Sequence, residues 1–171
     1  MTASFFEEHE HLSPPIWIVG IGNDYRSDDR VGLVVVRALQ ALQLPGTVVM
    51  ECPAIDPVFV EMWRAASLVI LVDAAAVATT VGTIHRIDVL TRPLPEQLAF
   101  PSTHSFGIVE ALALARTLEL LPPALVIYAI EGVNFDMGTC LSPEVEQAAH
   151  NVMQQIVAEV TRHACARPHP S

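Results

Sequence analysis

The stretch Ile16-Trp17-Ile18-Val19-Gly20-Ile21-Gly22-Asn23-Asp24-Tyr25-Arg26-Ser27-Asp28-Asp29-Arg30-Val31-Gly32 decides how this chain folds. Its first residues, Ile16–Ile21, form a continuous apolar run, which is typical of a strand buried on both faces of a sheet. Gly22 ends the run and a polar turn follows. Asp28 and Asp29 then open a segment with helical spacing of apolar residues. The stretch therefore predicts a buried strand, a loop and a helix start in one segment.

The composition indicates one packed domain and excludes several classes of partner. The chain has 171 residues, of which 51% are apolar, so we expect a single domain, residues 1–171, with an ordered core of about residues 15–163. Acidic residues outnumber basic ones by 19 to 9, and the net charge of -10 opposes binding to nucleic acid or to an anionic membrane. The three cysteines form no Cys-x-x-Cys pair, and no apolar stretch approaches the ~18 residues of a membrane span. We therefore expect a cytoplasmic protein.

Apolar runs and helical periodicities alternate along the rest of the chain. The runs predicted as strands are Ile16–Ile21, Thr47–Met50, Ser67–Val72, Thr83–Asp88 and Ala124–Ile130. The segments predicted as helices are Asp29–Leu42, Ile55–Ala66, His104–Leu121 and residues 142–163. Residues 74–80, which are small and featureless, and the proline-rich residues 91–102 are predicted as loops.

This alternation predicts an α/β fold, a three-layer α/β/α sandwich around a five-stranded, mostly parallel, twisted sheet. The expected strand order is 2-1-3-5-4, with Thr83–Asp88 as one antiparallel edge strand because its polar and apolar residues alternate. In such sheets, ligands bind at the carboxyl ends of the strands, where the strand order reverses. Here that point lies between the first and third strands.

Three potential ligand residues are expected at this edge. The loop after the first strand leads to Asp29, the third strand stops at Asp73, and the helix beginning near His104 must start at the same edge to run down toward the next parallel strand. Two carboxylates and an imidazole suit divalent ions such as zinc, nickel or iron. Three protein ligands would leave a coordination position open for water or a substrate group.

Each of these residues also has a simpler interpretation. Asp28 or Asp29 can equally serve as a helix cap, Asp73 can stabilise a turn, and His104 can be a surface residue. Arg26 can be a surface charge or a clamp for an anion. The residue types and their positions leave these alternatives open.

Five segments, in order along the chain, resemble the hydrogenase maturation proteases. They are Gly20–Gly32 with its Asp-Asp pair, Val69–Ala74 with a strand leading to Asp-Ala, Ser102–Ser105 with Ser-x-His, Ile130–Gly132 and Leu141–Val145. The resemblance covers roughly residues 16 to 160. Two segments depart from the family pattern: Arg30 replaces the usual glycine after the acid pair, and Glu51–Asp56 lacks a Gly-Gly-Thr-type turn.

The resemblance implies an endopeptidase that removes the C-terminal extension of a nickel–iron hydrogenase large-subunit precursor after nickel insertion. It implies that Asp29, Asp73 and His104 contact the metal and act in catalysis. The metal is expected to be nickel carried by the substrate, with zinc as the alternative. Asp28 is a further candidate for the general base.

The loop after the first strand is expected to face the substrate through Gly22, Asn23 and Arg26. We expect a monomer, because no amphipathic stripe is left without a place in the fold. Two other functions fit the same residues: a small-molecule metallohydrolase, and a non-catalytic, nickel-dependent binding or chaperone module for the large subunit.

Overall fold

The computed structural model describes residues 14–76, 78–101 and 106–166. Its strands are β1 (Ile16–Ile21), β2 (Thr47–Cys52), β3 (Leu68–Ala76), β4 (Ile84–Asp88) and β5 (Leu125–Gly132). They form one five-stranded sheet of order β2-β1-β3-β5-β4, in which every neighbouring pair is parallel except β4 with β5. The predicted strand order and the antiparallel edge strand are therefore confirmed.

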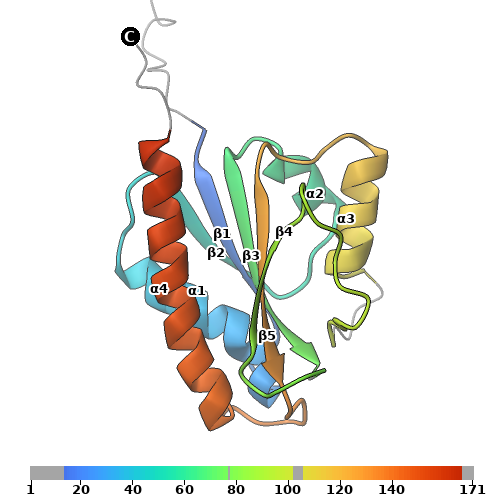
Figure 1. Ribbon diagram of the computed structural model, residues 1–171, viewed down its shortest axis with the longest axis vertical. Helices are drawn as coiled ribbons and strands as arrows, with labels where there is room; N and C mark the ends of the chain where they lie inside the picture. The colour runs from blue at the N-terminus through green and yellow to red at the C-terminus, as the bar shows by residue number, and fades with distance from the viewer. Residues whose placement is uncertain (1–13, 77, 102–105, 167–171) are drawn as a thin grey trace, which may run out of the picture.

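Helices cover both faces of the sheet, which completes the predicted α/β/α sandwich (Figure 1). The helices α1 (Val31–Ala41) and α4 (Pro143–Cys165) lie on one face, and α2 (Pro57–Trp63) and α3 (Ile108–Thr117) lie on the other. Alternate residues of β1, β3 and β5 therefore pack into two separate cores, so these strands read as unbroken apolar runs. None of the helices in the described ranges has the length and hydropathy of a transmembrane segment.

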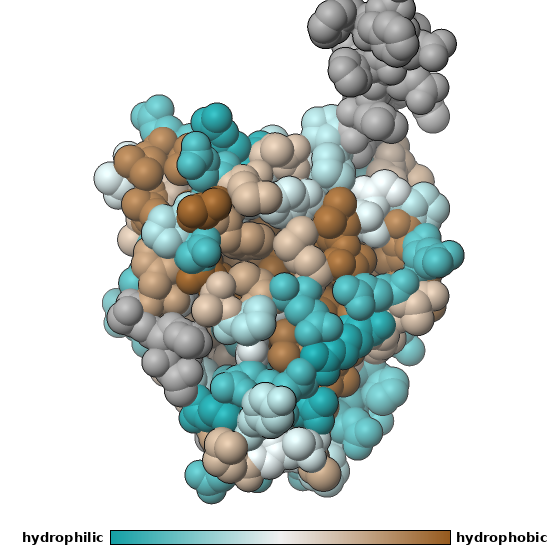
Figure 2. Space-filling view, turned by 180° about the vertical axis from the view of Figure 1, so that it is seen from behind, coloured by the Kyte–Doolittle hydropathy of each residue, from teal (hydrophilic) through white to brown (hydrophobic). Residues whose placement is uncertain are grey.

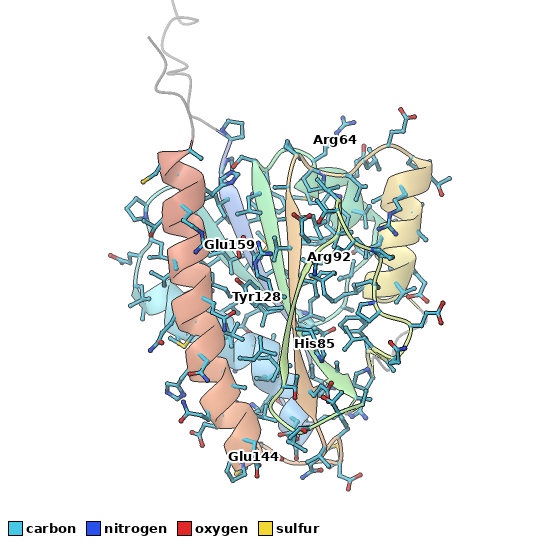
Figure 3. The ribbon with its side chains drawn as sticks, in the orientation of Figure 1. Arg64, His85, Arg92, Tyr128, Glu144 and Glu159 are labelled. Carbon is cyan, nitrogen blue, oxygen red and sulfur yellow. The ribbon has the colours of Figure 1, made fainter. Side chains whose placement is uncertain are left out.

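A buried polar contact holds α4 against the open edge of the sheet. Arg86 on β4 donates through Nε to Glu159 on α4 at 2.9 Å, and the hydroxyl of Tyr128 on β5 donates to the same carboxylate at 2.7 Å. Figure 3 shows Glu159 reaching from α4 toward Tyr128. Burial alone would raise the pKa of Glu159, but these two hydrogen-bond donors lower it below its usual value. The edge strand β4 is thus tied to the helical layer as well as to β5.

Three predicted boundaries near the expected site are wrong. The strand β3 continues to Ala76, so Asp73 lies inside the strand and the loop predicted from Ala74 is shorter. The cause is pairing with β5, which extends to Ala76 opposite Gly132. The helix predicted from His104 begins at Ile108 instead, where the N–H of Gly107 donates to Glu110 at 2.9 Å. The helix predicted from Asp29 begins as a 3-10 turn, η1 (Ser27–Arg30).

Two glycines let α1 pack directly on the sheet. A Cβ on Gly32 would lie 2.2 Å from the carbonyl oxygen of Ile21 and 2.3 Å from that of Val72. A Cβ on Gly20 would lie 2.2 Å from the carbonyl oxygen of Gly32. Any side chain would therefore push α1, and with it the preceding turn η1, away from β1 and β3.

We predict that Gly32→Ala lowers the free energy of unfolding by about 1–3 kcal/mol, because an added methyl group overpacks a backbone contact. Urea denaturation at neutral pH measures the change. The control is Ala41→Ser on the exposed end of α1, which should stay within about 0.5 kcal/mol of the parent protein. A Gly32→Ala protein as stable as its parent would contradict the tight packing.

Candidate active site

The structure brings Asp29 and Asp73 together at the carboxyl edge of the sheet. Asp29 lies in η1, which follows the loop after β1, and Asp73 lies in β3, the neighbour of β1. Both are buried, with 6% and 5% of their surface exposed. Burial, and then the negative charge of Asp29, raise the pKa of Asp73 well above its usual value, although the N–H of Ala74 donates to Asp73 Oδ1 at 2.8 Å. Two close carboxylates of this kind are poised for a cation or a proton.

The third predicted ligand, His104, lies outside the described residues, so its role stays a prediction. Within the described ranges, no three His, Cys, Asp or Glu side chains are grouped to hold a metal ion. Pro101, the last described residue before His104, lies at this edge. Arg26 Nη1 donates to the carbonyl oxygen of Pro101 at 3.5 Å and lies 3.9 Å from Asp29 Oδ2.

Asp28 has a different environment from its neighbour Asp29. It is fully buried, and its carboxylate accepts four hydrogen bonds: from the N–H groups of Val133 (3.0 Å), Asn134 (2.9 Å) and Ser142 (2.6 Å), and from the Ser142 hydroxyl (2.8 Å). These donors occupy the lone pairs that a general base would need. The geometry therefore favours a positioning role for Asp28 over the predicted role as a base.

Glu131, at the end of β5, is a second fully buried carboxylate at this edge. It accepts hydrogen bonds from the N–H groups of Ala78 and Thr79, both at 2.9 Å, and pairs with His85 Nε2 at 2.7 Å. Burial alone would raise the pKa of Glu131, but these contacts outweigh it and lower the pKa to about 2. Sequence reasoning gave this pair no structural role. One signal in the sequence could have indicated this role: Glu131 is a charged residue directly after the apolar run Ala124–Ile130.

The loop between β1 and η1 borders a cavity of about 310 Å³. Its lining residues are Gly22, Asn23, Asp24, Tyr25, Leu33, Glu51 and Pro53. Gly22 has a φ of +144°, and a Cβ there would lie 1.9 Å from the carbonyl oxygen of Asp29, so glycine is required. The predicted substrate-loop residues Gly22 and Asn23 therefore line a cavity beside Asp29, whereas Arg26 lies over the carboxylate of Asp29.

Two residues that line this cavity, Asp24 and Glu51, belong to an ion-pair network. Arg37 on α1 donates from Nη1 to Asp24 at 2.7 Å and from Nε to Glu51 at 2.9 Å. Arg30 Nη2 also donates to Asp24, at 3.2 Å, and Arg30 Nη1 contacts the carbonyl oxygen of Thr139. Hydrogen bonds from Arg37 lower the pKa of both Asp24 and Glu51. Seen from behind (Figure 2), hydrophilic side chains gather mostly in the lower half of the molecule.

Comparison with known proteins assigns the chain to a family. The hydrogenase maturation protease model, named HycI, matches residues 33–159. The chain belongs to the hydrogenase maturation protease family. The match includes Asp73 and His104 and begins just after the turn that carries Asp29.

Individual relatives agree with this assignment. The hydrogenase expression/formation protein HupD of Thiocapsa roseopersicina is 29% identical over 140 residues, which cover 78% of this chain and 62% of that protein. The chain thus spans less than two thirds of that curated relative. The hydrogenase maturation protease HycI of Thermococcus kodakarensis has a TM-score of 0.66 at 25% identity, covering 87% of this chain and 93% of its own. The endopeptidase HybD of E. coli, at 18% identity, shares the fold with a TM-score of 0.70, covering 86% of this chain and 93% of its own.

We predict that the stabilising effect of Glu131 depends on pH. Its pKa of about 2 lies below the ordinary value of 4.5, so the carboxylate stabilises the folded state above pH 4.5, and this contribution is lost as the pH falls toward 2. Glu131→Gln should therefore lower the free energy of unfolding most at neutral pH, with a difference from the parent that shrinks below pH 4.5.

Urea denaturation from neutral pH down to about pH 3 tests this dependence. The matched control is Glu96→Gln, since Glu96 is exposed. A loss of stability in Glu131→Gln that stays the same across the whole pH range would contradict the ionised, hydrogen-bonded carboxylate.

Proposed function

We propose that this protein is an endopeptidase that removes the C-terminal extension of a nickel–iron hydrogenase large-subunit precursor after nickel insertion. The observation that carries the proposal is the pair of buried carboxylates, Asp29 and Asp73, at the carboxyl edge of the sheet in a chain of the hydrogenase maturation protease family. The partner is the precursor itself. We propose a cytoplasmic monomer; the cysteines Cys52, Cys140 and Cys165, which form no disulfide, are in keeping with a reducing compartment.

The donor set at this edge fits a divalent cation. Asp29 repels Asp73, and burial adds to the cost of charging both carboxylates. A divalent ion between them would offset both effects, and carboxylate oxygen together with the imidazole of His104 suits nickel or zinc. We propose nickel carried by the precursor as the first choice and zinc as the second. Such an ion supplies polarisation of the scissile carbonyl or activation of water.

The chain's own residues then have separate tasks in hydrolysis. Asp29 and Asp73 would hold the metal, and Asp29 also fits the general base better than Asp28, whose carboxylate is occupied by four donors. Asp28 instead fixes the turn that carries Asp29. The cavity lined by Gly22, Asn23 and Glu51 offers space for residues of the precursor that flank the cut.

We predict that Asp73→Asn and Asp29→Asn each reduce precursor cleavage roughly 100-fold or more, because each removes a metal-binding carboxylate. Asp73→Asn should fold normally, because burial already opposes the charge on Asp73. Mass spectrometry of the C-terminus of the nickel-loaded precursor measures cleavage, and thermal unfolding checks the fold. Glu61→Gln, on the exposed side of α2, is the control with unchanged cleavage.

The same assay separates the alternatives. An intact C-terminus after incubation with wild-type protein that still binds the precursor would favour a chaperone module. An intact C-terminus without binding would favour a small-molecule hydrolase. Cleavage that continues at the full rate in both aspartate variants would contradict the assignment of the site.

We predict separately that His104→Ala abolishes the metal dependence of cleavage together with most of the activity, because it removes the imidazole ligand. The measurement is precursor processing across a titration of nickel. His150→Ala on the exposed surface of α4 is the matched control. Full cleavage by His104→Ala with unchanged metal dependence would rule out the role given to His104.

A further inference from the structure

The guanidinium of Arg26 joins three segments at the carboxyl edge. Its Nε donates to the carbonyl oxygen of Phe135 at 3.0 Å, in the loop after β5. Its Nη1 donates to the carbonyl oxygen of Pro101 at 3.5 Å, in the loop before α3. The same Nη1 lies 3.9 Å from Asp29 Oδ2. A positive charge is therefore held directly beside a carboxylate of the proposed active site.

The position of Arg26 is built into the backbone. Arg26 forms an isolated parallel bridge with Gly138, and the N–H of Asp29 donates to the carbonyl oxygen of Arg26 at 2.8 Å. The Arg26 side chain is 23% exposed, so a substrate atom can reach it. Within the part of the chain that the structure describes, Nε and Nη1 have acceptors and Nη2 has none. Two of the three guanidinium nitrogens are thus anchored, while Nη2 keeps its donors.

Peptide hydrolysis at this edge creates negative charge on the substrate, next to the carboxylates of the site. Attack of water on the scissile carbonyl places a charge on the carbonyl oxygen, and cleavage leaves a new carboxylate. Asp29 and Asp73 would repel both species, and both carboxylates are buried, where repulsion is strong. A fixed cation beside them offsets this repulsion, and an arginine fork suits a carboxylate because it can donate two parallel hydrogen bonds.

We propose that Arg26 is a catalytic residue that donates hydrogen bonds to the carbonyl oxygen of the scissile bond as its charge develops, and then to the new C-terminal carboxylate. In this step the oxygen of water bonds to the carbonyl carbon, and one water proton passes to a carboxylate of the site. The C–N bond breaks as the leaving amine takes that proton, and the new carboxylic acid releases the second water proton to solvent. Arg26 keeps its own protons throughout. The inference rests on the proposed function, because it assumes that a peptide bond is cut beside Asp29.

A kinetic test uses Arg26→Gln and Arg26→Lys with the nickel-loaded precursor. Loss of a preorganised donor to an oxyanion typically costs about 100- to 1,000-fold in kcat, so we expect that loss in Arg26→Gln with KM changed less than about 3-fold. Arg26→Lys keeps the positive charge but lacks the planar guanidinium, so its kcat should lie between those of Arg26→Gln and the wild-type protein. Arg64→Gln, far from this edge at the other end of the molecule (Figure 3), is the control with unchanged kinetics.

A binding test separates this role from a structural one. Two peptides with the sequence of the product C-terminus, one ending in a free carboxylate and one in an amide, compete with a labelled precursor peptide. Wild-type protein should prefer the carboxylate by about 10-fold or more, as expected for a charged hydrogen bond. Arg26→Gln should lose that preference, and Arg26→Lys should keep part of it.

The outcomes distinguish the two proposals. If wild-type protein cuts the precursor and Arg26→Gln keeps both its kcat and its carboxylate preference, the role of Arg26 is overturned while the proposed function stands. The role of Arg26 is also overturned if the variant loses activity only in proportion to a loss of thermal stability. If wild-type protein does not cut the precursor, the proposed function fails, and the catalytic role of Arg26 fails with it.

Discussion

The carboxylate of Asp28 is the contact on which the arrangement of the carboxyl edge depends. It receives donors from Val133, Asn134 and Ser142, which connect the turn after β1 to the end of β5 and the start of α4. Hydrogen bonds to a buried carboxylate are stronger than those between neutral groups. Removing one of the donors would leave a buried carboxylate that is only partly hydrogen-bonded, which is costly. The approach is so close that a Cβ on Gly132 would lie 2.8 Å from Asp28 Cβ. Asp29, the next residue, is thereby fixed relative to the whole sheet.

The acids at this edge differ in how many donors they receive, and this difference divides them by task. Glu131, with several donors, has a pKa lowered to about 2 and holds the loop between β3 and β4 in place. Asp73 receives one backbone donor and faces the charge of Asp29, so its pKa is raised. A carboxylate whose oxygens all accept hydrogen bonds is held in the charged form and serves the structure. A carboxylate with few hydrogen-bond donors can bind a cation instead. The same edge therefore contains both rigid supports and reactive groups.

Local signals were sufficient for the topology but not for the details of the site. Continuous apolar runs and short crossovers predicted the strand order, because a strand buried on both faces leaves a pattern within a few residues. The extension of β3 through Ala74–Ala76 was missed, since alanine has no strong preference and the strand exists through pairing with β5. The division of labour between Asp28 and Asp29 was also beyond the sequence. It depends on donors more than 100 residues away in the chain, such as Val133.

The two departures from the family pattern are linked in space. Arg30 and Glu51, which lie in the two departing segments, are joined through Asp24 and Arg37 in one network on the wall of the cavity beside Asp29. About a third of the Asp24 and Glu51 side chains is exposed, so screening by water makes the net stabilisation small. The network adds little stability, but it sets the shape and charge of the cavity. Its role is therefore better explained by binding of a molecule in the cavity than by stabilisation of the fold. Arg30, which replaces the glycine, binds Asp24 and the carbonyl oxygen of Thr139. The changes therefore alter the wall of the cavity, while Asp29 and Asp73 keep their places at the carboxyl edge.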